Sequence, residues 1–268
     1  MKDRLIVLGT GNANATRCYN TCFAIDFGHD LLLCDAGGGN GILRQLEAAG
    51  IGVERIHHLV VTHAHTDHVM GVVWLIRMIS ARMNTGRYEG ELHIYASAAL
   101  QEGLIQMANF MLQPQMIAQI GRRILFHEIT DGQETTAAGH IVRFFDIGST
   151  KMQQYGFTVS LSDGRRLCCL GDEPYNPICH EYAAGADWLL SEAFCRYCER
   201  DVFKPYEKHH STVKEACELA QQLGVPNLVL WHTEDKHIQD RKRLYAEEGS
   251  AYYHGCLYVP DDLDVIEL

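Results

Sequence analysis

The sequence predicts an α/β fold in which two β-sheets pack as a sandwich with helices on the outer faces. The first part of the chain indicates strands joined by turns, the middle mixes strands with helices, and the last third alternates strand and helix. The six prolines are scattered and no tandem repeat is present, so no linker divides the 268 residues. We therefore expect a single domain that spans residues 1–268.

Apolar runs and turn residues define the expected elements of the first half. A turn at Gly28 to Asp30 separates the second strand from the third, and a glycine cluster at Gly37 to Gly41 precedes the first helix. The expected strands are Arg4 to Leu8, Cys22 to Asp26, Leu31 to Asp35, Leu59 to Thr62 and Leu92 to Tyr95, and the expected helices are Ile42 to Ala49, His68 to Arg82 and Ala98 to Leu112.

The second half is expected to contribute further strands and then strand–helix pairs. Ser211 is an N-cap candidate for the helix that follows it, and Gly224 stands directly after the last turn of that helix. The expected strands are Ile124 to Ile129, His140 to Asp146, Phe157 to Ser162, Arg166 to Leu170, Trp188 to Glu192 and Leu228 to Trp231, and the expected helices are Thr212 to Leu223 and Gln239 to Glu248.

Composition and charge limit the classes of function. With 47% hydrophobic and 21% charged residues, the chain is typical of a globular protein with an ordered core. Its apolar runs are far shorter than the about 20 residues of a membrane helix, and it lacks a signal-peptide core, so we expect a cytoplasmic protein without a membrane span. The 23 basic and 34 acidic residues give a formal net charge of −11, which opposes nucleic-acid binding unless Arg122-Arg123 or Arg165-Arg166 forms a basic patch.

The segment Thr62 to His68 (THAHTDH) carries three histidines and an aspartate between an apolar strand and an apolar helix. Neutral imidazole and carboxylate groups are ligands of zinc-class metals. A strand-to-helix turn directs His63 and His65 to one side and Asp67 and His68 to another. The segment therefore predicts a site for two adjacent metal ions.

Together with six further landmarks, this motif resembles the metallo-β-lactamase superfamily, and in particular its phosphodiesterase branch that includes ribonuclease Z. The landmarks occur in the order of that branch. They are Leu8-Gly9-Thr10-Gly11-Asn12 with Asn20-Thr21, Cys34-Asp35-Ala36-Gly37, Leu170-Gly171-Asp172, Leu190-Ser191-Glu192-Ala193, His210-Ser211-Thr212 and Leu230-Trp231-His232. The resemblance implies a four-layer αββα sandwich with a hydrolytic metal site at the edges of the sheets.

The resemblance also implies a metal-binding role for each matching residue. Asp172 matches a carboxylate that bridges two metal ions, and either Asp67 or Asp172 would orient the attacking hydroxide. The implied ligands are His63 and His65 for the first ion, Asp67, His68 and His232 for the second, and Asp172 for both.

A further histidine is implied in catalysis. His210 matches a histidine near the scissile phosphate that assists protonation of the leaving group, and His209 beside it is a competitor for this role. Glu192 is a candidate for a carboxylate that orients a ligand histidine, and Asp35 is a second candidate.

The chain departs from the superfamily at one ligand. A third histidine for the first metal usually follows a strand ahead of the bridging aspartate, but residues 141–170 contain no histidine, and the matching position is Gly148. His140 lies at the other end of the same expected strand. Water, substrate or Asp146 would then fill the position, or only the second ion binds.

The resemblance implies a metal-dependent hydrolase, and the segments Ser191 to Ala193 and His210 to Thr212, which match the ribonuclease Z branch, imply a phosphodiesterase. Zinc, manganese and iron all suit the ligand set, and two ions are expected. Two alternatives stay open, namely an acyl hydrolase for thioesters or lactones, and a non-catalytic metal-binding protein, which Gly148 motivates.

The expected substrate is a small phosphodiester or nucleotide rather than folded RNA. The net charge opposes a polyanion, and Lys151, just after Gly148, is a candidate partner for one phosphate. A homodimer is expected because homodimers are the commonest soluble oligomers. The helix from Leu100 to Leu112 is expected to belong to the core, and the alternatives are that it packs against a dimer partner or shapes the mouth of the pocket.

Overall fold

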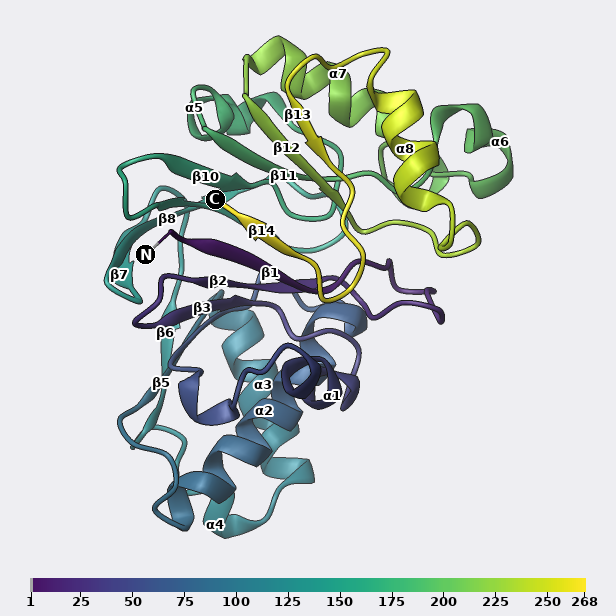
Figure 1. The fold of residues 1–268 in the computed structure, drawn as a ribbon. Helices are drawn as coiled ribbons and strands as arrows, with labels where there is room; N and C mark the ends of the chain where they lie inside the picture. Colours follow the sequence, from purple (N-terminus) through teal and green to yellow (C-terminus); the bar gives the residue numbers. More distant parts are fainter. Residues whose placement is uncertain (1) are drawn as a thin grey trace.

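The computed structural model describes residues 2–268 and places two seven-stranded sheets face to face (Figure 1). The first sheet has the order β14-β1-β2-β3-β4-β5-β6 and the second the order β13-β12-β11-β10-β9-β8-β7. The first sheet consists of β14 (Val265–Glu267), β1 (Arg4–Gly9), β2 (Cys22–Asp26), β3 (Leu31–Cys34), β4 (His58–Val60), β5 (Leu92–Ala96) and β6 (Ile124–Glu128). The second consists of β13 (Cys256–Tyr258), β12 (Asn227–Trp231), β11 (Trp188–Glu192), β10 (Arg166–Cys169), β9 (Tyr155–Ser160), β8 (His140–Asp146) and β7 (Glu134–Ala137).

Helices cover the outer face of each sheet, so the expected four-layer αββα sandwich is confirmed (Figure 1). Four helices follow the strands of the first sheet and four those of the second. They are α1 (Gly41–Ala48), α2 (Thr66–Asn84), α3 (Ala98–Met111) and α4 (Pro114–Ile117), then α5 (His180–Ala183), α6 (Arg200–Phe203), α7 (Val213–Leu223) and α8 (Arg241–Gly249). Short 3₁₀ turns lie at Val53–Arg55, Pro177–Cys179, Tyr197–Glu199 and Tyr206–Lys208.

Each sheet is half antiparallel and half parallel. Strands β1 to β3 and β7 to β10 pair antiparallel, whereas β3 to β6 and β10 to β13 pair parallel. Antiparallel neighbours need only a turn, and parallel neighbours need a crossover, usually a helix. This is why strand-rich stretches and strand–helix alternation follow one another along the sequence.

Strand residues alternate between the core that separates the sheets and the cores beneath the helices. In β11, Trp188 and Leu190 face the first sheet, while Leu189 packs under the helices of the second. A strand covered on both faces reads as a continuous apolar run. The strands that sequence reasoning missed, β7, β13 and β14, are short and partly exposed, and therefore lack such a run.

Helix boundaries differ from the expectation at two places that matter for the site. Helix α2 begins at Thr66, so Asp67 and His68 lie in its first turn. Thr212, not Ser211, is the N-cap of α7, because Glu215 accepts hydrogen bonds from the backbone N–H and hydroxyl of Thr212. The left-handed C-cap at Gly224 is confirmed.

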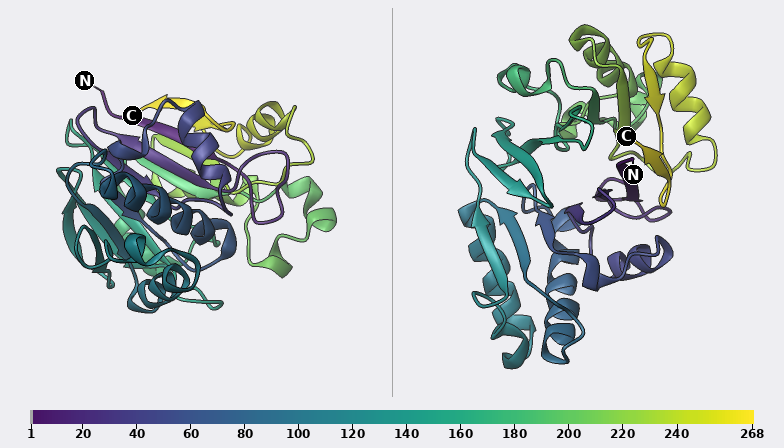
Figure 2. Two further views of the ribbon diagram at one scale, coloured as in Figure 1. Left: turned by 90° about the horizontal axis from the view of Figure 1, so that it is seen from below. Right: turned by 60° about the vertical axis from the view of Figure 1, so that its left-hand side comes forward.

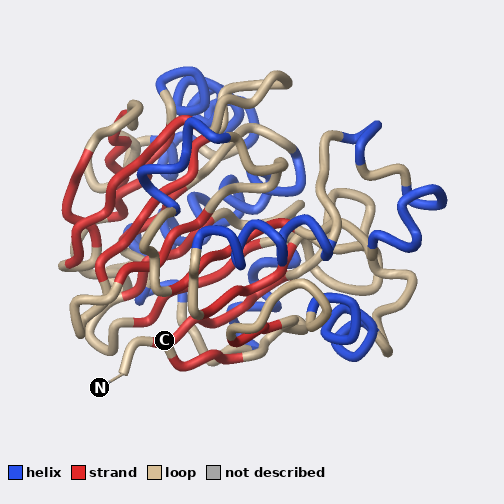
Figure 3. The backbone as a smooth tube through the Cα atoms, turned by 90° about the horizontal axis from the view of Figure 1, so that it is seen from above, coloured by secondary structure: helices blue, strands red, loops and turns tan. Residues whose placement is uncertain are grey.

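The candidate site lies beyond the carboxyl ends of parallel strands from both sheets. Strands β3, β4, β10, β11 and β12 all end on this side, and loops with short helices extend past the strand ends (Figure 3). The segment around α6 stands out from the sandwich there (Figure 2). Across residues 2–268, no helix combines the length and apolar character that a membrane crossing requires.

Candidate metal centre

The histidine-rich turn connects β4 to α2. Its backbone is extended at His65, which is the N-cap position of α2, and turns helical at Thr66. Asp67 therefore lies in the first turn of a long helix, where the partial positive charge of the helix N-terminus favours a carboxylate. The change from strand to helix splits the motif into two groups of side chains, as the spacing predicts.

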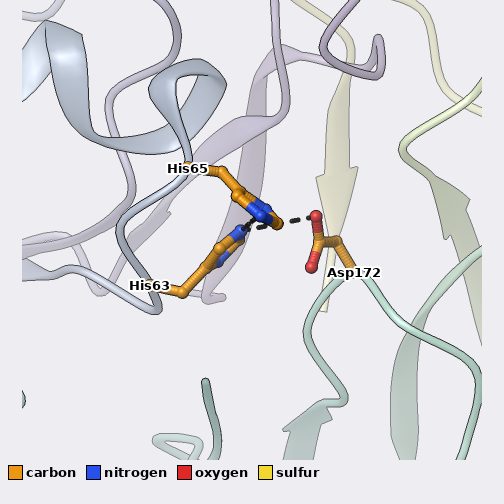
Figure 4. A group of neighbouring side chains, drawn as sticks. All are labelled: His63, His65 and Asp172. Carbon is orange, nitrogen blue, oxygen red and sulfur yellow. Dashed lines mark hydrogen bonds and ion pairs between the residues drawn. The ribbon is translucent and has the colours of Figure 1, made fainter. Parts of the chain in front are cut away.

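One group brings His63 and His65 together with Asp172, which follows β10. His63 Nε2 lies 2.8 Å from His65 Nδ1 and 3.5 Å from Asp172 Oδ2. Figure 4 shows both imidazoles pointing from the turn before α2 towards the Asp172 carboxylate. We call these three side chains the open cluster, because His65 is only half-buried.

A second group, the buried cluster, consists of Asp67, His68 and His232, with Asp172 on its border. His68 Nε2 and His232 Nε2 each lie 3.3 Å from Asp172 Oδ2 and 3.5 Å from Asp67 Oδ2. Four ligands held about 2.05 Å from a tetrahedral metal ion would be about 3.3 Å apart. The separations in the buried cluster fit a metal ion of this size.

Three polar atoms that face the centre of the buried cluster lack a hydrogen-bond partner among residues 2–268. His68 Nε2, His232 Nε2 and Asp172 Oδ1 are buried and make no aligned hydrogen bond to protein. Buried polar groups are normally satisfied, and one left unpaired costs free energy. A divalent cation held by these atoms removes that cost, so the residues present fit a metal site.

Asp35, at the end of β3, orients histidines of both clusters. Its carboxylate accepts from His68 Nδ1 (2.7 Å) and from the Thr62 hydroxyl (2.8 Å), and that hydroxyl lies 2.9 Å from His63 Nδ1. Because the hydroxyl proton goes to Asp35, the His63 Nδ1–H donates to the Thr62 oxygen. Both imidazoles then present Nε2 as a free lone pair, which is the tautomer that a metal ligand needs.

Electrostatics favour the cation-binding protonation states of Asp172 and His63. Burial raises the pKa of Asp172, but the neighbouring His63, His68 and His232 outweigh burial and hold that pKa well below its usual value. Burial lowers the pKa of His63 well below the ordinary histidine value. The carboxylate is therefore anionic and the imidazole neutral near pH 7. At His68, in contrast, burial is outweighed by Asp35, Asp172 and Asp67, which hold its pKa well above the ordinary histidine value, so a cation at the buried cluster would displace a proton from this ring.

His210 and Glu192 form a pair beside the buried cluster. The His210 Nδ1 atom lies 3.6 Å from Glu192 Oε2, and Glu192 Oε1 accepts from the Ser211 backbone N–H. The His210 ring stacks on Phe194 at 4.9 Å and lies at the same distance from the His232 ring. Glu192 thus lies beside His210, and Glu192, His210 and His232 each offer a ligand atom within 4.8 Å of the other two. Asp35, the second candidate from the sequence, contacts the ligand histidine directly.

His209 is not part of this arrangement. It is exposed, lies on a left-handed turn with φ of 57°, and belongs to none of the His/Asp/Glu clusters found in residues 2–268. The structure therefore places His210, rather than its neighbour, beside the candidate ligands.

Among residues 2–268, no side chain stands in for the missing histidine. Gly148 has φ of +71°, and a Cβ there would lie 2.6 Å from Asn176 Nδ2 and 2.7 Å from Ile178 Cδ1. Asp146 accepts the Gly148 backbone N–H at 2.7 Å, and His140 stacks on Phe27 at the far end of β8. Neither belongs to the clusters, so the open cluster has two histidines and one shared carboxylate.

Sequence reasoning missed two residues that support the site. The Thr62 hydroxyl hydrogen-bonds both the Asp35 carboxylate and His63 Nδ1, and so fixes the His63 ring relative to Asp35. Gln154 is fully buried, and its Oε1 accepts the Asp172 backbone N–H at 3.4 Å. Thr62 adjoins the motif and offered a local signal. Gln154 offered none, because its contact with Asp172 depends on the pairing of β9 with β10.

Three of the four paired arginines are engaged by other groups of the protein. Arg123 donates to the backbone carbonyls of Tyr88 and Gly90, and Arg166 donates to that of Ala184. Arg165 pairs with Asp163 at 2.7 Å. Arg122 is exposed, and its side chain has no such partner among residues 2–268.

Relatives with curated names cover the full length of the chain. The chain is 23% identical to ribonuclease Z of Bacteroides fragilis, with 98% of each protein covered. It is 26% identical to ribonuclease Z of Myxococcus xanthus, with 99% of this chain and 97% of that protein covered.

Solved structures share the fold. YhfI of Bacillus subtilis, a metallo-β-lactamase fold protein, matches with a TM-score of 0.81 and 17% identity over 100% of both chains. The short form of human tRNase Z matches with a TM-score of 0.75 and 20% identity over 98% of both. A diphosphatase from the PhnP family matches with a TM-score of 0.72 and 18% identity over 100% of this chain and 98% of that one.

The two mixed sheets, the flanking helices and the buried His/Asp clusters define a metallo-β-lactamase fold protein related to ribonuclease Z. Within this class, residues 3–250 match the family model described as anti-Pycsar protein Apyc1. The chain belongs to that family.

Proposed function

We propose that this protein is a metal-dependent phosphodiesterase that hydrolyses a small phosphodiester such as a nucleotide. The observation that carries the proposal is the convergence of six His and Asp side chains on one edge of the sandwich, with His210 beside them. The relatives named ribonuclease Z and the structural neighbour named as a diphosphatase support phosphorus–oxygen chemistry over acyl transfer.

Two divalent ions, with zinc as the first candidate and manganese or iron as alternatives, fit the two clusters. His63, His65 and Asp172 would hold one ion, and Asp67, His68, His232 and Asp172 the other. Ions in such a site activate a water molecule for attack and neutralise charge that develops on the phosphoryl oxygens.

The remaining steps belong to side chains of the chain itself. His210 donates a proton to the leaving oxygen, and Glu192 beside Nδ1 keeps the ring oriented and stabilises its protonated form. Burial lowers the pKa of His210, but the Glu192 carboxylate outweighs burial and raises that pKa above the ordinary histidine value, as a general acid near neutral pH requires. Asp67 accepts a hydrogen bond from the attacking water and orients it.

The size of the adjoining cavity supports a small substrate. A cavity of about 350 Å³ has His210 in its wall, with Tyr175, Tyr206 and Leu219 around it. Glu215 and Glu218 also line it, and the six candidate metal ligands lie outside its lining. Ligand pockets for small molecules begin at about 300 Å³. The net charge of −11 and the engagement of Arg123, Arg165 and Arg166 within the protein further oppose a folded RNA.

The test combines metal analysis with turnover. Purified protein should contain close to two ions per chain and should hydrolyse bis(p-nitrophenyl) phosphate in a metal-dependent way, faster than it hydrolyses a thioester or lactone. Preferential cleavage of the thioester or lactone would favour the acyl hydrolase. Metal without turnover of any of these substrates would favour a metal-binding protein, and protein without metal would overturn the proposal.

We also propose a homodimer, which the surface of α2 and α3 supports. Trp74 and Met111 are 38% and 50% exposed and line a small apolar hollow, and Phe110, which precedes Met111 in α3, is 89% exposed. Apolar side chains gathered in this way mark association surfaces. Sedimentation velocity should give a dimer for the native chain and a monomer for Phe110→Asp.

A further inference from the structure

Lys151 lies between the loop that follows Asp172 and the loop that precedes His210. Its Nζ donates to the Lys208 carbonyl at 2.7 Å and lies 3.6 Å from Glu173 Oε1. Glu173 follows Asp172 in sequence, and Lys208 is two residues before His210. The ammonium group therefore sits where the loop after Asp172 approaches the loop before His210.

The ammonium group of Lys151 is held in place, but not all of its N–H donors have a hydrogen-bond partner. An ammonium group has three N–H donors, and the Lys208 carbonyl is its only hydrogen-bond partner among residues 2–268. Its side chain is only 26% exposed, although lysine heads usually extend into solvent. Glu173 also accepts from the Ser149 hydroxyl at 2.9 Å, so one carboxylate anchors the loop at two residues. The loop thus presents a cation with free donors.

The position of the loop relates Lys151 to the open cluster. Residues 148–153 follow β8, where a third histidine would be supplied in related sites, and here they supply an ammonium group instead. Lys151 Nζ lies 3.6 Å from Glu173 Oε1, and Glu173 directly follows Asp172, the carboxylate of the open cluster. His65 is the half-buried ligand, through which solvent reaches the site.

A phosphodiester needs such a charge in this protein. The chain carries a formal charge of −11, and Arg123 and Arg166 are engaged by backbone carbonyls. Lysine is a common phosphate binder, since its free N–H groups match phosphoryl oxygens.

We propose that Lys151 forms an anion subsite at the rim of the metal centre, where it binds a non-bridging oxygen of the substrate phosphate and selects phosphodiesters over neutral esters. This inference rests on the proposed function for its choice of substrate. The binding of inorganic phosphate tests it independently of turnover.

The experiment compares Lys151→Met with wild type, both loaded with zinc, by calorimetric titration with inorganic phosphate and by kinetics with bis(p-nitrophenyl) phosphate. A charge-assisted hydrogen bond of ordinary strength predicts about tenfold weaker phosphate binding and about tenfold lower kcat/KM, mostly through KM. Metal content should stay equal. Lys151→Arg should restore most of the affinity, and Lys242→Met, which removes the same charge on α8 beside Asp261 and Asp264, should behave as wild type.

Each outcome separates the two proposals. If wild type binds phosphate tenfold more tightly than Lys151→Met but cleaves no phosphodiester, the subsite stands and the proposed function fails. Equal phosphate affinity in the two proteins would overturn the subsite, whatever the turnover. Weaker binding together with loss of metal would also overturn it, because Lys151 would then act by maintaining the site.

Discussion

The buried and the open cluster share Asp172 but differ in completeness. In the buried cluster, His68 Nε2 and His232 Nε2 each lie 3.3 to 3.5 Å from both Asp67 and Asp172, and all four side chains are buried. The open cluster has His63, the half-buried His65 and a share of Asp172. The difference teaches that one motif of seven residues supplies two clusters of unequal completeness, because the remaining side chains come from different loops.

The difference in completeness between the two clusters has a local cause. The buried cluster receives its last ligand from β12, whose end turns through His232 at φ of 54°. The open cluster would receive its last ligand from the end of β8, but the chain turns there at Gly148 and offers no side chain. Fewer protein ligands leave more positions for water or substrate, and such positions are typical of catalytic sites.

The largest expected effect comes from removing what the clusters share. Asp172→Ala should abolish metal binding at both clusters and lower kcat/KM by about 10³-fold, because several kcal/mol of charge stabilisation are lost. Metal analysis and phosphodiester turnover measure it. Asp163→Ala, which removes a carboxylate exposed at a turn, should leave both unchanged. Retention of one tightly held ion in Asp172→Ala would show that the buried cluster does not depend on the shared carboxylate.

The next effect separates chemistry from metal binding. His210→Ala should lower kcat by about 10² to 10³-fold through loss of the general acid, with the metal content unchanged. His209→Ala is the matched control and should keep wild-type rates. The kcat of His210→Ala should fall less for a chromogenic substrate with a good leaving group than for one with a poor leaving group. Equal losses for both substrates would remove His210 from the protonation step.

A substitution at Asp35 tests whether this carboxylate orients the candidate ligand histidines. Asp35→Asn keeps the shape of the side chain but weakens its hold on His68 and Thr62, and should lower metal affinity by about 10 to 100-fold. Competition with a chromogenic chelator measures the affinity. Asp30→Asn, which changes a carboxylate beside His58 on the first sheet, serves as the control. An unchanged affinity in Asp35→Asn would mean that packing alone orients the histidines.

Stepwise chelation measures the expected difference in metal affinity between the buried and the open cluster. One ion should leave at lower chelator concentration than the other, with affinities that differ by at least about tenfold, as expected for one ligand more or less. His65→Ala should abolish the weaker class and His232→Ala the stronger. Release of both ions in one step would contradict the comparison.

The smallest effect concerns Gly148. Gly148→His should not complete the open cluster, since a Cβ there points at Asn176 and Ile178, and the positive φ disfavours a side chain. We expect a loss of about 1 kcal/mol in the free energy of unfolding, with metal affinity unchanged. Urea denaturation and chelator competition measure the two quantities. A gain in affinity at the weaker site would show that the loop can turn the new side chain inwards.

Much of the fold follows from local sequence. The strands with continuous apolar runs, such as β3, β10 and β12, were predicted because both of their faces are buried. Strand β14 was not, since it has one buried residue among three and exists by pairing with β1, about 260 residues earlier in the chain. Whether the chain folds as one domain over residues 1–268 stays a prediction.

The sequence by itself determined which residues are available for a metal centre. The motif from His63 to His68 is local, and the strand-to-helix change within it separates two ligand pairs through backbone geometry alone. Asp172, His210 and His232 were found by their order along the chain, which matches a known family.

Only the tertiary structure decided which side chains meet. The carboxyl ends of β3, β4, β10, β11 and β12 converge because their strands pair in parallel within two packed sheets. That convergence assigns Asp35 to the ligand histidines, Glu192 to His210, and Lys151 to the rim. No local pattern encodes these contacts, since each joins segments whose distance apart is set by sheet pairing and core packing.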